Sequence, residues 1–137
     1  MRFLAIDFGE QRTGLAIGDD STRIVSPAGV VESGKLDEQL RVIGDVIDEH
    51  GADALVVGLP LNMDGTEGPR AHVTRDFAAR LGERFGLAVH LVDERLSSDI
   101  ADEKMSRSGL THKGKKQRRD ALAAATILER FLDTLEF

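Results

Sequence analysis

The chain has 137 residues, of which 41% are hydrophobic and 31% charged, and its net charge is −6. This length predicts one domain over residues 1–137, with a core that needs neither disulfides nor a structural metal. The composition excludes a disordered or collagen-like chain, and no apolar run is long enough to cross a membrane. Cysteine is absent, which excludes a thiolate nucleophile and cysteine-ligated zinc and is consistent with a cytoplasmic location.

The first part of the chain predicts three strands and a helix. The strands cover residues 3–8, 13–17 and 24–31. The first strand is apolar on both faces, which favours a central place in a sheet. The helix covers residues 36–50, where apolar residues recur at helical spacing, and it ends at Gly51.

The second part of the chain alternates short strands with helices. The predicted elements are a strand at 54–58, a loop at 59–68, a helix at 73–85, a strand at 87–92, a short helix at 97–105 and a last helix at 120–135. A meander of three strands followed by this alternation predicts an α/β fold with a mixed five-stranded sheet. Helices should cover both faces of the sheet, in the ribonuclease-H-like order of elements.

Two strands of the predicted sheet end on acidic residues. Asp7 lies near the end of the predicted first strand, where a lone buried carboxylate is costly unless it is paired or binds a metal. Asp93 and Glu94 follow the strand at 87–92, and ligands collect at the carboxyl ends of parallel strands. Side-chain alternation puts Asp93 and Glu94 on opposite faces, so one of them is expected in a shared site. The alternatives are a turn-capping role for Asp7 and a helix-starting role for the acidic pair.

A third acid, Asp120, is predicted to open the last helix. The apolar residues on its side of that helix form a core-facing stripe, which consists of Ala124, Ile127, Leu128 and Phe131. An ordinary N-capping aspartate is the alternative interpretation. Carboxylates from two strand ends and one helix could together bind a pair of Mg²⁺ or Mn²⁺ ions for phosphodiester cleavage. The four histidines show no zinc-binding spacing.

One segment of this acidic chain is strongly basic. Residues 104–119 contain seven lysines and arginines and no acid, so the remainder of the chain is more acidic than the net charge suggests. A polyanion would be repelled by most of the surface and attracted to this segment, which is predicted to be a loop. A solvated loop without a partner is the alternative.

Four motifs occur in order along the chain: Asp7-Phe8-Gly9 with Arg12 and Gly14, the octapeptide GLPLNMDG at 58–65, DERLS at 93–97, and Asp120-Ala121. Together they resemble the YqgF-type family of pre-16S rRNA nucleases, which are related to Holliday junction resolvases. The resemblance spans nearly the whole chain. It implies a ribonuclease-H-like fold, a cytoplasmic location, a divalent-metal nuclease activity and a role in maturing the 5′ end of small-subunit ribosomal RNA.

The resemblance also implies roles for individual residues. The catalytic and metal-binding acids would be Asp7, Glu94 and Asp120, with Asp93 as a further candidate. The residues expected to contact substrate are Arg12, Asn62, Gly65 and Arg95, together with Lys113, Lys115 and Lys116 of the basic segment. An arginine fork suits a phosphate, although an ion pair with a nearby carboxylate is the alternative for both arginines.

Other functions remain open on the sequence alone. A Holliday junction resolvase acting on DNA would use the same acids and metals, and no motif reads a 2′-hydroxyl. A non-catalytic nucleic-acid-binding factor would keep the acids for structure only. An actin-like ATPase shares the glycine pattern after Asp7, but the chain is too short for its two lobes. The chain is expected to act as a monomer or a homodimer, without a membrane partner.

Overall fold

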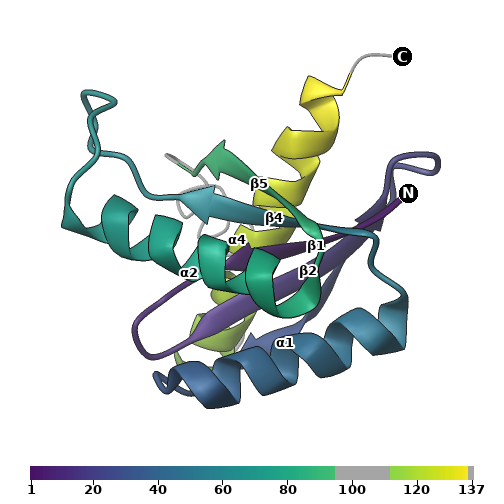
Figure 1. Cartoon of the computed structure of the whole chain (residues 1–137), viewed down its shortest axis with the longest axis horizontal. Helices are drawn as coiled ribbons and strands as arrows, with labels where there is room; N and C mark the ends of the chain where they lie inside the picture. Colours follow the sequence, from purple (N-terminus) through teal and green to yellow (C-terminus); the bar gives the residue numbers. More distant parts are fainter. Residues whose placement is uncertain (95–111, 136–137) are drawn as a thin grey trace.

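Five strands form one mixed sheet in the order β3-β2-β1-β4-β5 (Figure 1). This computed structural model describes residues 1–94 and 112–135, with side chains for 1–94 and 120–135. The strands are β1 Arg2–Asp7, β2 Thr13–Asp19, β3 Val25–Val31, β4 Ala54–Leu59 and β5 Ala88–Asp93. The helices are α1 Leu36–His50, α2 Pro69–Phe85 and α4 His112–Thr134. The predicted α/β sheet of five strands is confirmed.

Strand directions set which ends of the sheet meet. The first three strands form an antiparallel meander, with Asp7 of β1 opposite Gly14 of β2. Strands β1, β4 and β5 run parallel, so their carboxyl ends share one edge of the sheet. The central position of β1 confirms what its apolar character on both faces predicted.

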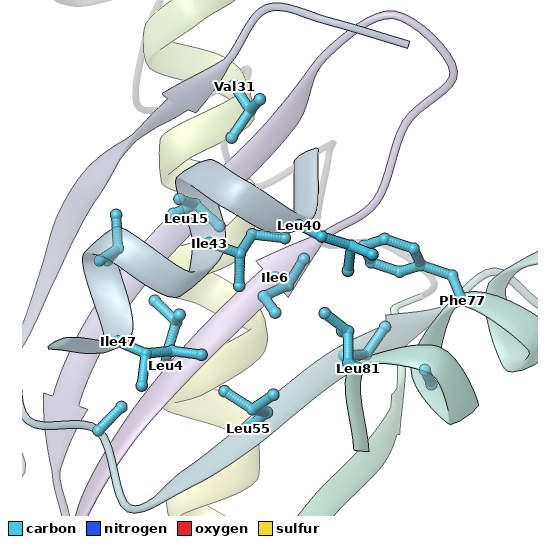
Figure 2. Close-up of a cluster of buried hydrophobic side chains, with 14 residues drawn as sticks. Leu4, Ile6, Leu15, Val31, Leu40, Ile43, Ile47, Leu55, Phe77 and Leu81 are labelled. Carbon is cyan, nitrogen blue, oxygen red and sulfur yellow. The ribbon is translucent and has the colours of Figure 1, made fainter. Parts of the chain in front are cut away.

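Helices α1 and α2 cover one face of the sheet. Figure 2 shows their side chains packed against those of β1, β2 and β4. The large side chains of this layer are almost completely buried and include Leu4, Ile6, Leu15, Ile43, Leu55 and Leu81. Burying each such side chain contributes about 1.5–3 kcal/mol, so this layer holds the two helices firmly to the sheet.

Helix α4 covers the opposite face and lies behind the sheet in Figure 1. Its predicted apolar stripe is buried there against Phe3, Ala5 and Ala16, and Phe3 meets Phe131 edge-on with ring centroids 5.1 Å apart. Helices on both faces are therefore confirmed. The small side chains of Ala121, Ala124 and Ala125 allow α4 to lie close to the strands.

Two predicted helix starts were wrong. Helix α2 begins at Pro69, four residues before the predicted start at Val73. Proline suits the first turn of a helix because its fixed φ is helical and the missing N–H has no partner there anyway. Helix α4 begins at His112, so residues 112–119 are helical and not a loop. Lysine, arginine and glutamine are good helix formers, and their preference for the helix extends α4 from Asp120 towards the N-terminus.

The helix ends agree better with the prediction. Helix α1 has the predicted bounds and ends at Gly51, and α2 ends at Gly86. Both glycines have positive φ, near 66° and 65°, a left-handed conformation that glycine adopts without steric cost. The predicted helix at 97–105 lies outside the described residues. None of the helices described is long and apolar enough to cross a membrane.

Candidate active site

Two of the predicted acids lie at the shared carboxyl edge of the parallel strands. Asp7 is the last residue of β1, and Glu94 directly follows β5. Alternation along β1 puts Asp7 on the face of Phe3 and Ala5, which is the face covered by α4. Val92 packs on the same face, so Glu94, two residues later, belongs to it as well. This agrees with the expectation that alternation separates Glu94 from Asp93.

Strand β4 lies between the two acids, and Gly58 makes their contact possible. Ile6 pairs with Val57 across β1 and β4, so Gly58 is level with Asp7. A Cβ atom on Gly58 would collide with the Oε2 atom of Glu94 and with Ile127 of α4. The missing side chain therefore leaves the space through which Glu94 reaches across β4. The GLPLNMDG motif contained this glycine, but the sequence did not indicate its role.

Asp7 and Glu94 share one proton. Burial, the neighbouring charge of Glu94 and a hydrogen bond in which the Asp7 carboxyl donates to Glu94 together raise the pKa of Asp7 to about 8. Burial also raises the pKa of Glu94, while the hydrogen bond from Asp7 lowers it. Two adjacent buried carboxylates cannot both ionise without a positive charge beside them. The pair is therefore suited to a cation.

Asp120 comes from α4, the helix that covers the same face of the sheet as Asp7 and Glu94. It lies within α4 and does not cap the helix, so the predicted N-cap alternative was wrong. The α4 backbone at Asp120 occupies the place where a Cβ atom of Gly14 would lie, which brings the helix directly onto β2. The charge of Asp120 contributes to raising the pKa of Asp7. Asp7 thus interacts electrostatically with both of the other predicted acids.

Arg12 binds Asp120 in the structure. Its Nε donates to Oδ2 of Asp120 at 2.8 Å, and the two side chains are 31% and 21% exposed. This is the ion-pair alternative that the sequence left open. Among the side chains described, no three from histidine, aspartate and glutamate lie close enough together to hold one metal ion. With Asp120 turned to Arg12, Asp7 and Glu94 are the two predicted acids in contact in this conformation.

The donor chemistry fits a divalent metal of the hard type. Mg²⁺ and Mn²⁺ prefer carboxylate oxygens and retain water as further ligands. Asp7 and Glu94 share a proton, and a metal cation would take the place of that proton between the two carboxylates. Asp120 is a third carboxylate whose charge acts on Asp7. Zinc is disfavoured because histidine is missing from this group.

Arg70 is a site residue that the sequence reasoning missed. It stands in the first turn of α2, and its Nη2 donates to the carbonyl oxygen of Phe8 at 3.2 Å. Its positive charge lowers the pKa of both Asp7 and Glu94. The signal that could have found it is Gly68-Pro69, a helix start that would have placed Arg70 on α2 instead of in a loop.

The loop between β4 and α2 uses its polar groups internally. Asn62 donates through Nδ2 to Thr66 Oγ1 at 3.0 Å, and the Gly65 amide donates to the Asn62 carbonyl at 2.8 Å. Gly65 has φ of 87°, which the turn requires. The phosphate contacts expected of Asn62 and Gly65 would compete with these bonds, and they stay predictions.

The remaining predicted substrate residues belong to the basic part of the chain. Lys113, Lys115 and Lys116 lie in the first turns of α4, and the described side chains begin after them. Arg95 lies outside the described residues. Asp93 ends β5 beside a cavity of about 570 Å³ that lies between β5 and the end of α4, away from Asp7.

The protonated Asp7 predicts a specific pH dependence of stability. Asp7 keeps its proton up to about pH 8 in the folded chain, but an unfolded aspartate loses it near pH 4. Between about pH 4 and about pH 8 the folded state therefore binds one more proton at Asp7 than the unfolded state does. The free energy of unfolding consequently falls as pH rises through this range. Asp7→Asn removes this dependence.

Thermal unfolding in chelator at several pH values measures this effect. The melting temperature of the wild type should fall relative to that of Asp7→Asn across this window. Adding Mg²⁺ should raise the wild-type melting temperature more at pH 8 than at pH 5, because binding competes with the proton. Parallel pH profiles for the two proteins would contradict the shared proton.

Comparison with known proteins finds relatives that are named as nucleases. The family described as "RuvX: Holliday junction resolvase" matches residues 1–134. A protein from Anaeromyxobacter sp. (strain K), named "Putative pre-16S rRNA nuclease", is 43% identical over 97% of this chain and 97% of its own length. A protein of the same name from Bordetella parapertussis is 45% identical over 96% of this chain and 93% of its own.

Solved structures share the fold at low sequence identity. RuvC of T. thermophilus, in complex with a Holliday junction substrate, matches with a TM-score of 0.60 and 16% identity, over 99% of this chain and 98% of the other. The Fowlpox virus Holliday junction resolvase matches with a TM-score of 0.59 and 10% identity, over 99% and 100%. These matches confirm the ribonuclease-H-like fold predicted from the order of elements.

Proposed function

The chain belongs to the RuvX family, and from that premise we propose that it is a divalent-metal-dependent endonuclease that processes the 5′ end of pre-16S rRNA. The observation that carries the proposal is the hydrogen-bonded pair of carboxyl groups of Asp7 and Glu94, together with the charge of Asp120, which also raises the pKa of Asp7. Three acids from β1, the end of β5 and α4 have no structural need to share one buried corner. A structural carboxylate would pair with a cation of the protein, as Asp120 does with Arg12, but the salt bridges of the described residues include none to Asp7 or Glu94.

In this proposal Asp7, Glu94 and Asp120 hold Mg²⁺ or Mn²⁺. When bound, such ions activate water and stabilise the charge that develops on the phosphate oxygens. The chain itself contributes the positions of the acids. Asp7 is held by the central strand, Glu94 by the space above Gly58, and Asp120 by the contact of α4 with Gly14. Asp120 becomes available when Arg12 turns from it to a phosphate of the substrate.

The basic start of α4 supports nucleic acid as the substrate class. Lys113, Lys115 and Lys116 add positive charge to a chain that is otherwise acidic, so phosphate attraction concentrates there. Arg95 would extend this surface. Aromatic residues make up only 4% of the chain, which favours recognition of backbone and shape over base stacking. We further propose that residues 1–137 act as one domain in the cytoplasm, as a monomer or a homodimer.

A DNA junction is the second candidate substrate. The fold is shared with RuvC, whose structure was determined with a Holliday junction substrate, and both chemistries would use the same acids. The names of the more similar relatives favour ribosomal RNA.

A cleavage assay decides between the two substrates. The wild-type protein is incubated with Mg²⁺ and either an end-labelled pre-16S rRNA fragment or a four-way DNA junction, with a chelator control for each. Faster cleavage of the RNA, abolished by the chelator, is expected. Metal-dependent cleavage of the junction alone would favour the resolvase, and binding without cleavage of either would favour a non-catalytic factor.

A further inference from the structure

A cavity of about 380 Å³ adjoins Asp120, one of the three predicted acids. It lies between the turn after β1, the first turn of α2 and helix α4, and its lining consists of Gly9, Glu10, Gln11, Arg12, Arg70 and Asp120. Two arginines from separate elements therefore face one hollow beside the carboxylates. A hollow of this size has room for a phosphate group and its water.

Arg70 is held in place by the body of the protein. Its Nη2 donates to the Phe8 carbonyl, and its Cζ atom lies 5.5 Å from the centroid of the Phe8 ring. That ring stacks in turn on Phe77 of α2 with centroids 4.1 Å apart. The guanidinium is thus pre-organised by β1 and α2, so little side-chain entropy is lost when it binds a ligand.

The other end of the guanidinium faces an exposed carboxylate. Nη1 of Arg70 is 3.6 Å from Oε1 of Glu10, whose side chain is 79% exposed. Exposed ion pairs at such distances contribute little to stability, so a stronger anion can displace Glu10 easily. A phosphodiester offers two oxygens to an arginine fork, which is a better match than one distant carboxylate oxygen.

We propose that Arg70 binds a backbone phosphate of the nucleic-acid substrate in this cavity, and that Glu10 occupies Arg70 until the phosphate displaces it. This inference rests on the proposed function. It adds a phosphate-binding subsite at Arg70 and a carboxylate of the protein, Glu10, that competes with the phosphate for Arg70. Together with Arg12, Arg70 supplies positive charge in a cavity whose lining also contains the carboxylates of Glu10 and Asp120.

Binding of a fluorescent RNA stem-loop tests the subsite directly. All proteins carry Asp7→Asn to prevent cleavage, and fluorescence anisotropy measures affinity at several salt concentrations. Arg70→Gln should weaken binding about tenfold and reduce the slope of log affinity against log salt by about 0.9, the value for one lost phosphate contact. Glu10→Gln should strengthen binding about threefold, and this gain should disappear when Arg70→Gln is also present.

The ion pair of Arg41 with Asp45 on α1 gives matched controls. Its atoms are 3.5 Å apart and both side chains are exposed, so Arg41→Gln and Asp45→Asn change the same charges away from the cavity. The inference is overturned if Arg70→Gln binds like Arg41→Gln, or Glu10→Gln like Asp45→Asn. A purely structural Arg70 would weaken binding on substitution but leave Glu10→Gln without effect, which also overturns it. If the protein with Arg70 and Glu10 intact binds no RNA stem-loop and no four-way DNA junction, the proposed function fails together with the inference.

Discussion

Replacing both Asp7 and Asp120 with asparagine is expected to abolish RNA cleavage and to leave the fold intact. The two side chains supply carboxylates from β1 and α4, and asparagine removes both charges with little change of shape. Metal-assisted stabilisation of the transition state is worth several kcal/mol, so its loss lowers the rate by about 10³-fold or more. Single-turnover cleavage of an end-labelled pre-16S rRNA fragment in Mg²⁺ measures the effect.

The fold should tolerate the double substitution for reasons visible at the site. Asp7 holds a proton below about pH 8, so a neutral amide resembles its state in the folded chain. Asp120 pairs only with the partly exposed Arg12 among the hydrogen bonds described. Asp45→Asn with Asp48→Asn, both on the exposed face of α1, removes two carboxylates as a control. Undiminished cleavage by the Asp7 and Asp120 variant would refute the assignment of these acids.

Replacing Gly14 with alanine is expected to reduce the free energy of unfolding by about 3 kcal/mol, at the upper end of overpacking effects. The new Cβ atom would collide with the backbone carbonyl of Asp120 in α4. A side chain can rotate away from such a clash, but a helix backbone cannot. Helix α4 must therefore move off β2 as a unit, which disturbs its buried stripe and displaces Asp120. Cleavage should fall with stability.

Urea unfolding monitored by circular dichroism checks this prediction. Gly82→Ala in α2 is the matched control, because its Cβ atom would lie 3.6 Å from Val89 Cγ2, an ordinary contact. That change should raise stability by about 0.5–1 kcal/mol, since alanine favours a helix interior over glycine. A Gly14→Ala protein as stable as the wild type would show that α4 does not rest on β2 at this point.

The helix bounds that depend on short-range sequence patterns were predicted closely. Helix α1 has the expected bounds, and both Gly51 and Gly86 end their helices, because apolar periodicity and glycine caps act over a few residues. The starts of α2 and α4 were misplaced where polar residues form the first turns. Those turns carry little apolar signal, although Pro69 is itself a start signal.

The candidate site was predicted in part. Asp7 and Glu94 were expected at strand ends, and the structure brings them together with Asp120. Arg70 and the space above Gly58 were not foreseen, because both depend on which strands become neighbours. The packing of α4 against β2 decided that Arg12 holds Asp120 in this conformation.

The amino-acid sequence by itself determined the secondary-structure order, the apolar faces and the identity of three acids that a buried sheet edge does not readily accept. These properties depend on residues close together in the chain. Only the tertiary structure decided that Asp7 and Glu94 share a proton across β4, and that Arg70 and Glu10 line a cavity beside them. Proton sharing and charge pairing act over a few ångströms in space, and strand pairing brings together groups that lie up to about ninety residues apart in sequence.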